Sequence, residues 1–427
     1  MRSHDNLVRG TGRRAYLGTI ATGTAFALAG CMGSAGSDEL EVIHGWTGGD
    51  GEAAINALIE AFEENHGDIE TNFEASGGEG NAQVNSVVQR RLTNSNPMSS
   101  FANWPGANLE NYENGLMDIE ADVWDAEGFK DTMQERAIDL CTYNDQMVAV
   151  PIGSHRMNNL FYNTAAFDEA GVDAEELGSV PDLIDALETI DEETEYTPFA
   201  HGMDAGFLGL QTFAQILTSQ SGVDAYMDFI DGNGDRDAML EALESLQEIR
   251  ENYITDDASS IGYTEAAQYL ISGDAACMHG GNWMYGMFRE DDEFNYGEEW
   301  DWVPFPGTDG VYFYHVDAFI AVGDNPTPDD TIAWQQFVGS KEAQIAFNEP
   351  KGSVPLRTDI DSEELSEFLA LNYEDLLEST DFPPTIAHGL AVSPRAKNDC
   401  EGVIANEFSG PYNAEAAVDG LLDAVSE

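Results

Sequence analysis

Basic residues are scarce in this sequence. Its 427 residues include 17 Lys and Arg against 80 Asp and Glu, which gives a formal net charge of −63 at pH 7. The lysines are Lys130, Lys341, Lys351 and Lys397. Because no basic stripe exists to neutralise phosphates, the composition excludes nucleic acid as a partner and disfavours an anionic membrane surface.

Motifs for metals and for nucleophilic catalysis are also missing. No two of the eight histidines form a His-x-x-x-His pair, no two of the four cysteines form a Cys-x-x-Cys pair, and no Gly-x-Ser-x-Gly occurs. The turn at 231–237 opens like a calcium loop, but Arg236 replaces its turn glycine and Ala242 its bidentate glutamate, which favours a solvated acidic turn. We therefore expect neither a metal nor another cofactor.

The few cysteines limit covalent cross-linking. Besides Cys31 there are Cys141, Cys277 and Cys400, and an oxidising compartment would allow one disulfide among their three pairs. Cys277 lies in the apolar run 275–278, which predicts a buried free thiol. The pairing that we then favour is Cys141–Cys400.

The N-terminal segment 1–31 has the pattern of an export signal. Arg13-Arg14 precede a stretch of small apolar residues at 15–30, which ends in Leu28-Ala29-Gly30-Cys31. This resembles a twin-arginine signal with a lipoprotein cleavage box, and the stretch is short for a transmembrane anchor, which needs ~20 residues. A single transmembrane anchor is the alternative. Cleavage before Cys31 would leave a lipid-carrying cysteine at the outer face of the cell membrane.

The acidic surplus accompanies a composition that can fold. Hydrophobic residues make up 42 % and aromatic residues 10 %, so the chain is not a disordered acidic tail. Such a charge repels itself unless salt screens it, and the Debye length falls to ~3 Å at 1 M salt. The composition resembles that of a protein from an extreme halophile and favours an archaeal source.

The order of expected elements indicates an open α/β sheet. Residues 32–39 are small and polar, which is typical of a flexible tether. Strands are expected at 40–46, 71–75 and 100–103 with helices between them, which is βαβ order. Later strands are expected at 147–152, 159–162, 301–307 and 312–322, a mostly helical stretch at 182–252, and helices at 331–347 and 362–379.

The length after the signal predicts two lobes rather than one core. We place lobe 1 at about 40–150 and 308–358, and lobe 2 at about 151–307 and 359–427. In open α/β sheets ligands bind beyond the carboxyl ends of the strands, and in a two-lobed version this edge faces a cleft.

Aromatic, histidine and acidic residues gather at such places. Aromatic rings can stack on the C–H faces of a sugar, and carboxylates can accept its hydroxyl protons. The alternative is structural: a core tryptophan, or a histidine that only satisfies core hydrogen bonds. The candidate ligand-binding residues are Trp46, Asp50, Glu52, Trp104, His155, His201, Asn282, Trp283, Asp317, Lys351 and His388.

Taken in order, these segments resemble one family, the extracellular sugar-binding lipoproteins of ABC importers (family 1 solute-binding proteins), and within it the glucose-binding branch. The resemblance extends from about residue 40 to the end of the chain. The matching stretches are HGWTGGDGEAAINAL, NSNPMSS, VAVPIGSHRMNNLFYN, AHG, ISGDAACMHGGNW, PFPGTDGVYFYHVDAF, KGSVPLR and PTIAHGLAVSP.

The resemblance implies a two-lobed periplasmic-binding-protein-like fold of type II, in which hinge crossovers join two open sheets flanked by helices. It implies stacking by Trp46 and hydrogen bonds from Asp50 or Glu52, Asp317, Lys351 and His388. The chain departs from the branch at four places: Gly45 and Phe207 stand near positions where the branch has a tryptophan, Trp104 where it has a polar residue, and Asn282 where it has an acid.

We therefore predict a monomeric sugar receptor, not an enzyme. It would close on a monosaccharide, glucose first, and deliver it to membrane permease subunits. The alternatives are a receptor for another hexose or a disaccharide, an exported glycoside hydrolase with two carboxyls ~5–10 Å apart, and a surface lectin.

Overall fold

The computed structural model describes residues 39–47, 49–77 and 81–426. The predicted signal, Cys31 and nearly all of the predicted tether lie outside the described residues. Across the described part of the chain, every helix is too short or too polar to cross a bilayer.

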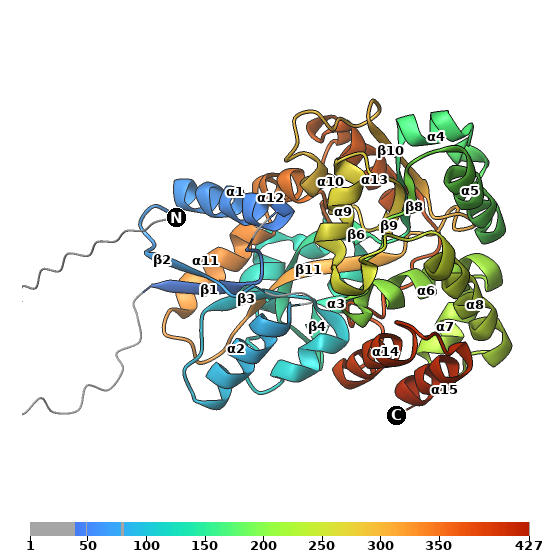
Figure 1. Ribbon diagram of the computed structural model, residues 1–427. Helices are drawn as coiled ribbons and strands as arrows, with labels where there is room; N and C mark the ends of the chain where they lie inside the picture. The colour runs from blue at the N-terminus through green and yellow to red at the C-terminus, as the bar shows by residue number, and fades with distance from the viewer. Residues whose placement is uncertain (1–38, 48, 78–80, 427) are drawn as a thin grey trace, which may run out of the picture. The chain divides into compact units, whose positions relative to one another are not determined.

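The first sheet has five strands in the order β2-β1-β3-β11-β6 (Figure 1). β1 is parallel to β2 and β3, whereas β11 is antiparallel to both of its neighbours, β3 and β6. β6 and β11 are buried along their whole length, as expected for strands covered on both faces. The strands are β1 (Leu40–His44), β2 (Thr71–Ala75), β3 (Ser100–Asn103), β6 (Ala149–Arg156) and β11 (Tyr314–Ala321).

Amphipathic helices cover this sheet. In α1 the buried residues Ile55, Leu58 and Phe62 recur at helical spacing, and the Phe62 ring meets Trp334 of α11 with ring centroids 5.0 Å apart. The elements of this part are α1 (Gly49–Asn65), α2 (Ala82–Thr93), α3 (Glu135–Leu140), α11 (Pro328–Val338), α12 (Lys341–Lys351) and the small hairpin β4 (Thr142–Tyr143) and β5 (Gln146–Met147).

The second sheet has four strands in the order β10-β7-β9-β8. β7 follows β6 directly in the chain, so the polypeptide passes from one sheet to the other there. The strands are β7 (Asn159–Asn163), β8 (Thr197–Phe199), β9 (Ala275–Gly280) and β10 (Trp300–Pro304). The helices are α4 (Thr164–Ala170), α5 (Val180–Glu193), α6 (Gly206–Ser221), α7 (Val223–Ile230), α8 (Arg236–Asn252), α9 (Tyr263–Ile271), α10 (Met284–Phe288), α13 (Glu367–Glu378), α14 (Pro394–Glu407) and α15 (Ala414–Val425).

Short 3-10 and π turns complete the chain. They are Gly106–Tyr112, Glu120–Asp125, Phe129–Asp131, Ala174–Glu176, Ala258–Ser260 and Ser362–Glu364.

This architecture confirms the predicted two-lobed α/β fold, with two sheets flanked by helices. The lobe boundaries at 150, 307 and 358 stay predictions. The stretch 331–347 is helical as predicted, but it is divided between two helices, α11 and α12. Ser340 interrupts it, because its hydroxyl caps α12 by accepting a hydrogen bond from the backbone N–H of Ala343 at 3.1 Å.

The predicted Cys141–Cys400 disulfide is wrong, because Cys141, Cys277 and Cys400 are all free and buried. Cys141 follows α3 beside the first sheet, whereas Cys400 lies on α14, which packs on α6 and α15. The prediction of a buried free thiol at Cys277 is confirmed. Burial raises the pKa of all three thiols, that of Cys400 to about 12.

The calcium-like turn at 231–237 starts a helix. The Asp235 carboxylate accepts hydrogen bonds from the backbone N–H groups of Asp237 and Ala238, at 2.9 and 3.1 Å, and so caps α8. The described residues include no group of three His, Cys, Asp or Glu side chains placed to hold a metal ion.

Candidate ligand-binding site

Sheet topology brings the ends of four strands to one edge. β1, β3 and β6 run in one direction and finish at His44, Asn103 and Arg156, whereas the antiparallel β11 begins there at Tyr314. In the register of β11 on β6, His315 lies opposite His155, and Asp317 lies opposite Gly153. Since alternate residues of a strand share a face, His155, His315 and Asp317 point to the same side of the sheet.

These three side chains form one hydrogen-bonded unit. His315 Nε2 lies 3.1 Å from Asp317 Oδ1, and His155 Nε2 lies 3.3 Å from Asp317 Oδ2. The two imidazole rings are stacked, with centroids 5.6 Å apart and planes 9° from parallel. Both carboxylate oxygens of Asp317 are therefore engaged by histidine nitrogens.

Burial and the contacts within the unit together determine its charge. Burial and the nearby charge of Lys351 lower the pKa of His155 to about 4, and burial also lowers the pKa of His315. Burial acts to raise the pKa of Asp317, but attraction to His315 and the hydrogen bonds from both histidines hold it well below its usual range. The unit at neutral pH is thus an ionised carboxylate between two neutral imidazoles.

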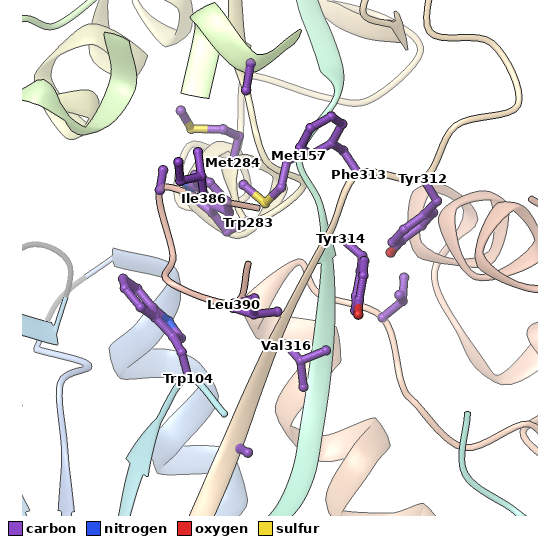
Figure 2. Close-up of a cluster of buried hydrophobic side chains, with 14 of the residues drawn as sticks. Trp104, Met157, Trp283, Met284, Tyr312, Phe313, Tyr314, Val316, Ile386 and Leu390 are labelled. Carbon is purple, nitrogen blue, oxygen red and sulfur yellow. The ribbon is translucent and has the colours of Figure 1, made fainter. Parts of the chain in front are cut away.

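Aromatic rings surround the unit. The Trp104 ring, directly after β3, lies edge-on to His315 at 5.3 Å and to His388 at 4.8 Å between centroids. The Trp283 ring, before α10, lies 5.4 Å from His155 and 5.9 Å from His388. Figure 2 shows Trp104 and Trp283 on one side of the strand pair and Tyr312 and Tyr314 on the other.

Both lobes contribute to the cluster. Asn282 follows β9 of the second sheet, and its side-chain amide lies 2.7 Å from His155 Nδ1. Its backbone N–H donates to the carbonyl of Arg156 at 3.0 Å, which fixes the turn against β6. His388 lies 4.1 Å from the His315 ring, and its Nδ1 lies 2.8 Å from the Thr385 hydroxyl.

Several polar atoms in this cluster lack a hydrogen-bond partner among the described residues. They are His315 Nδ1, Trp283 Nε1 and one polar atom of the Asn282 amide, all buried. Buried polar atoms are normally paired, and an unpaired one costs about 1–3 kcal/mol. Such atoms are suited to a ligand that both donates and accepts hydrogen bonds.

Lys351 enters from the end of α12. Its side chain is buried, and its charge lowers the pKa of both His155 and His315, so it lies within electrostatic range of the cluster. Gly352, with φ of 78°, ends the helix in the left-handed conformation that favours glycine.

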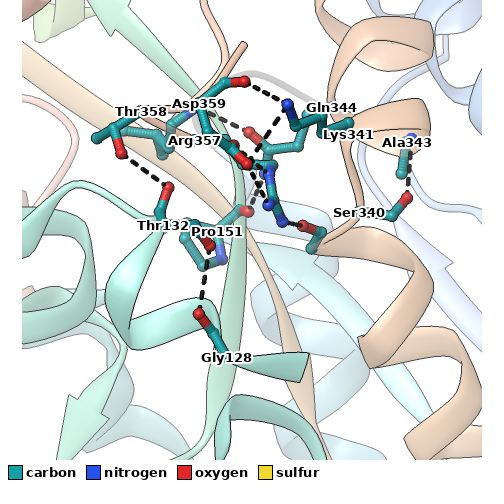
Figure 3. Close-up of polar contacts among 12 residues, drawn as sticks. Gly128, Thr132, Pro151, Ser340, Lys341, Ala343, Gln344, Arg357, Thr358 and Asp359 are labelled. Carbon is teal, nitrogen blue, oxygen red and sulfur yellow. Dashed lines mark hydrogen bonds and ion pairs between the residues drawn. The ribbon is translucent and has the colours of Figure 1, made fainter. Parts of the chain in front are cut away.

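The segment after Lys351 is held by polar contacts (Figure 3). Arg357 donates to both carboxylate oxygens of Asp359, at 2.8 and 2.9 Å, and to the carbonyl of Gly339 at 2.8 Å. Gln344 links α12 to β6 by donating to the Pro151 carbonyl at 2.7 Å. The arginine of the KGSVPLR motif therefore fixes the loop that follows Lys351.

Trp46 lies beside the same face of β11. Its ring contacts Phe319 at 5.8 Å and Phe347 of α12 at 4.9 Å, and Phe319 is two residues after Asp317. Glu52 is exposed in the first turns of α1. The side chain of Asp50 lies outside what the structure describes.

His201 does not join the cluster in the described contacts. Its Nε2 accepts from the Arg250 guanidinium at 2.9 Å, and Arg250 also donates to the Phe408 carbonyl at 2.6 Å. The ring therefore pairs with a buried cation that connects α8 to the end of α14.

Two residues outside the predicted set belong to the cluster. His315 stacks on His155 and approaches His388, and its place two residues before Asp317 was the signal for it. Phe207, noted above as a replacement for a missing tryptophan, contacts the His388 ring at 5.1 Å.

The chain thus has two sheets joined by strand crossovers, and polar and aromatic side chains from both lobes meet at the strand ends. This arrangement is that of a two-lobed receptor fold. The model of the bacterial extracellular solute-binding protein family matches residues 57–370, and the chain belongs to this family.

Individual relatives extend this match. The "Xylose/arabinose-binding protein XacG" of Haloferax volcanii is 58 % identical, with 100 % of each chain covered. Among solved structures, a "Chitin oligosaccharide binding protein" superposes with a TM-score of 0.79 at 17 % identity, covering 91 % of this chain and 98 % of the other. A protein from work on xylan utilisation by Caldanaerobius polysaccharolyticus gives 0.78 at 18 % identity, covering 90 % and 99 %.

Proposed function

We propose that this protein is the receptor of an ABC importer for a neutral monosaccharide, and that the sugar is an aldopentose of the xylose or arabinose type. The choice of sugar rests on one observation, the 58 % identity, over the whole of both chains, to a relative named for binding xylose and arabinose. An aldopentose therefore replaces glucose as the first candidate.

The chemistry of the cluster supports a neutral polyol. Trp46, Trp104 and Trp283 offer aromatic surface for the C–H faces of a sugar ring. The unpaired polar atoms of His315, Trp283 and Asn282 match the donors and acceptors of hydroxyl groups. Asp317 and Lys351 contribute opposite charges, so a ligand with a net charge gains little there.

The state of Asp317 favours binding over hydrolysis. A glycoside hydrolase needs a carboxylic acid with a raised pKa to protonate the leaving oxygen. The pKa of Asp317 is lowered instead, because His155 and His315 both stabilise its ionised form. Asp317 is thus a poor general acid, and this favours a receptor over a glycoside hydrolase.

Tryptophan fluorescence in molar KCl tests the proposal. D-Xylose, L-arabinose, D-glucose, D-galactose and maltose would be titrated separately, and we expect a saturable change with a pentose at lower concentration than with glucose. Glucose binding more tightly than both pentoses would overturn the pentose assignment. If none of these sugars changes the fluorescence at millimolar concentration, the proposal of a monosaccharide receptor is wrong. Release of xylose from xylobiose would favour a hydrolase.

We also propose that the protein is exported and anchored by lipid at Cys31, so that the sugar is delivered to permease subunits at the membrane. A single acyl chain anchors only marginally, and so a second chain or contact with the permease would be needed. In fractionated cells the wild-type protein should be in the membrane fraction and accessible to external protease. The Cys31→Ser variant should be released or remain uncleaved; a cleaved variant that stays equally membrane-bound contradicts the anchor.

A further inference from the structure

We infer that His315 is a ligand-contacting, specificity-determining residue whose Nδ1 accepts a hydrogen bond from one hydroxyl group of the sugar, with Asp317 as the positioning residue behind it. The inference rests on the proposed sugar-binding function and assigns a role to a residue outside the predicted ligand-binding set.

The contact with Asp317 determines which nitrogen of the His315 ring carries the proton. An ionised carboxylate only accepts hydrogen bonds, so the nitrogen that approaches it at 3.1 Å, His315 Nε2, must carry the proton. In a neutral imidazole the other nitrogen then has a lone pair and no proton. His315 Nδ1 is therefore an acceptor, fixed in position by the strand register of β11.

The neighbouring histidines differ in this respect. His155 Nδ1 already faces the Asn282 amide at 2.7 Å, and His388 Nδ1 faces the Thr385 hydroxyl at 2.8 Å. His315 Nδ1 is buried and has no partner within the described part of the chain. Of these three stacked or adjoining rings, His315 is the one whose Nδ1 remains for a ligand.

The surroundings select the kind of group that reaches this atom. The rings of Trp104 and His388 lie 5.3 and 4.1 Å from the His315 ring, so the approach is lined by aromatic surface. A buried acceptor of this kind favours a hydroxyl donor and penalises a ligand that presents only C–H at that point. The site should consequently discriminate against one monodeoxy sugar in particular.

The experiment compares D-xylose with its 2-, 3- and 4-deoxy derivatives, by calorimetry in molar KCl, on wild type and on His315→Gln. The glutamine amide can keep an N–H group near Asp317 but offers no acceptor in place of Nδ1. We expect wild type to bind one deoxy derivative at least tenfold more weakly than D-xylose. His315→Gln should bind D-xylose at least tenfold more weakly and lose that discrimination.

The controls separate this inference from the proposed function. His66→Gln changes a partly buried histidine that contacts Phe62 and Phe337, and it should bind like wild type. If wild type binds none of the sugars titrated above, the proposed function fails; if it binds L-arabinose or a hexose but not D-xylose, the deoxy series of the bound sugar replaces the xylose series. If wild type binds but folded His315→Gln keeps its affinity, or keeps the same preference among deoxy sugars, the inference is wrong.

A second variant keeps the test decisive if His315→Gln does not fold. The shorter amide of His315→Asn can reach the Nδ1 position but not Asp317. This variant should still discriminate against the same deoxy sugar, although it binds more weakly overall. Complete loss of discrimination in His315→Asn would mean that the hydrogen bond to Asp317, and not Nδ1, determines specificity.

Discussion

Several histidines in the described part of the chain are buried in neutral form. Burial is the main cause that lowers the pKa of His44, His155 and His279 to about 4, and it lowers the pKa of His315 as well. In an unfolded chain each of them would regain a pKa near 6.5. The folded state therefore binds fewer protons than the unfolded state between these two values.

This difference predicts a loss of stability in mild acid. Because the folded pKa values are depressed, the stability from these histidines is fully present above pH 6.5 and is lost as the pH falls towards about 4. Each such histidine contributes about 1.4 kcal/mol per pH unit in that range. Urea unfolding at fixed molar KCl should give constant stability from pH 8 to 7 and a decline between pH 6 and 5.

A matched variant identifies the source of the decline. His279 is buried, its Nε2 lies 3.0 Å from the Met157 carbonyl, and it lies outside the cluster around Asp317. The His279→Gln variant should show a shallower decline, by about one bound proton. A stability profile that is flat from pH 8 to 5 would contradict the neutral, buried state of these rings.

The sequence was sufficient to identify most residues of the cluster, but not which side chains pair with one another. Trp104, His155, Trp283, Asp317 and His388 were expected from the predicted strand ends and crossovers and from the family resemblance, and the structure places their rings and carboxylate together. His201 occupied an equivalent place in the sequence yet pairs with Arg250. Which way a ring faces depends on the register of distant segments, and sequence spacing does not encode that register.

At the scale of elements, β6 is fastened to α13 by a buried cation. Arg156, at the end of β6, is 3 % exposed, forms an ion pair with Asp375 of α13, and lies over the Trp302 ring at 5.0 Å. Removing the charge of Asp375 would leave a buried guanidinium without its carboxylate partner.

The Asp375→Asn variant should therefore be less stable than wild type. The Asp375 side chain is 45 % exposed, so solvent screens the pair and we expect a loss of about 1–2 kcal/mol. The control is Asp399→Asn, which removes a surface partner of Arg395. The Arg395 side chain is 71 % exposed and the Asp399 side chain 52 % exposed, so this change should alter stability by less than ~0.5 kcal/mol. Equal urea midpoints for wild type and Asp375→Asn would show that α13 is held by its apolar contacts alone.

Elements were predictable where hydrophobic periodicity was continuous and less so where a polar cap intervened. The first three strands matched closely: they were expected at 40–46, 71–75 and 100–103 and lie at 40–44, 71–75 and 100–103. The helix expected at 331–347 was split by the Ser340 cap, and the one expected from 362 begins at Glu367. A serine inside a periodic stretch is ambiguous in sequence, because only its hydrogen bond distinguishes a cap from a surface residue.

At the scale of the whole molecule, the net charge of −63 opposes compaction. Salt screens the repulsion between these charges, since the Debye length shortens from ~10 Å at 0.1 M to ~3 Å at 1 M. We expect circular dichroism to show unfolding as KCl is lowered from molar concentration, and the melting temperature to rise with KCl. A melting temperature independent of salt would contradict the halophilic interpretation of the composition.

The buried thiols make this receptor suitable for site-specific labelling. Maleimide reagents react with exposed thiolates, whereas Cys141, Cys277 and Cys400 are buried with raised pKa values. With Cys31 replaced by serine, cysteines introduced at the exposed positions Glu60 of α1 and Glu244 of α8 would carry a donor and an acceptor dye, one on each lobe. The distance between the lobes of single molecules could then be followed during sugar binding without altering any residue of the core.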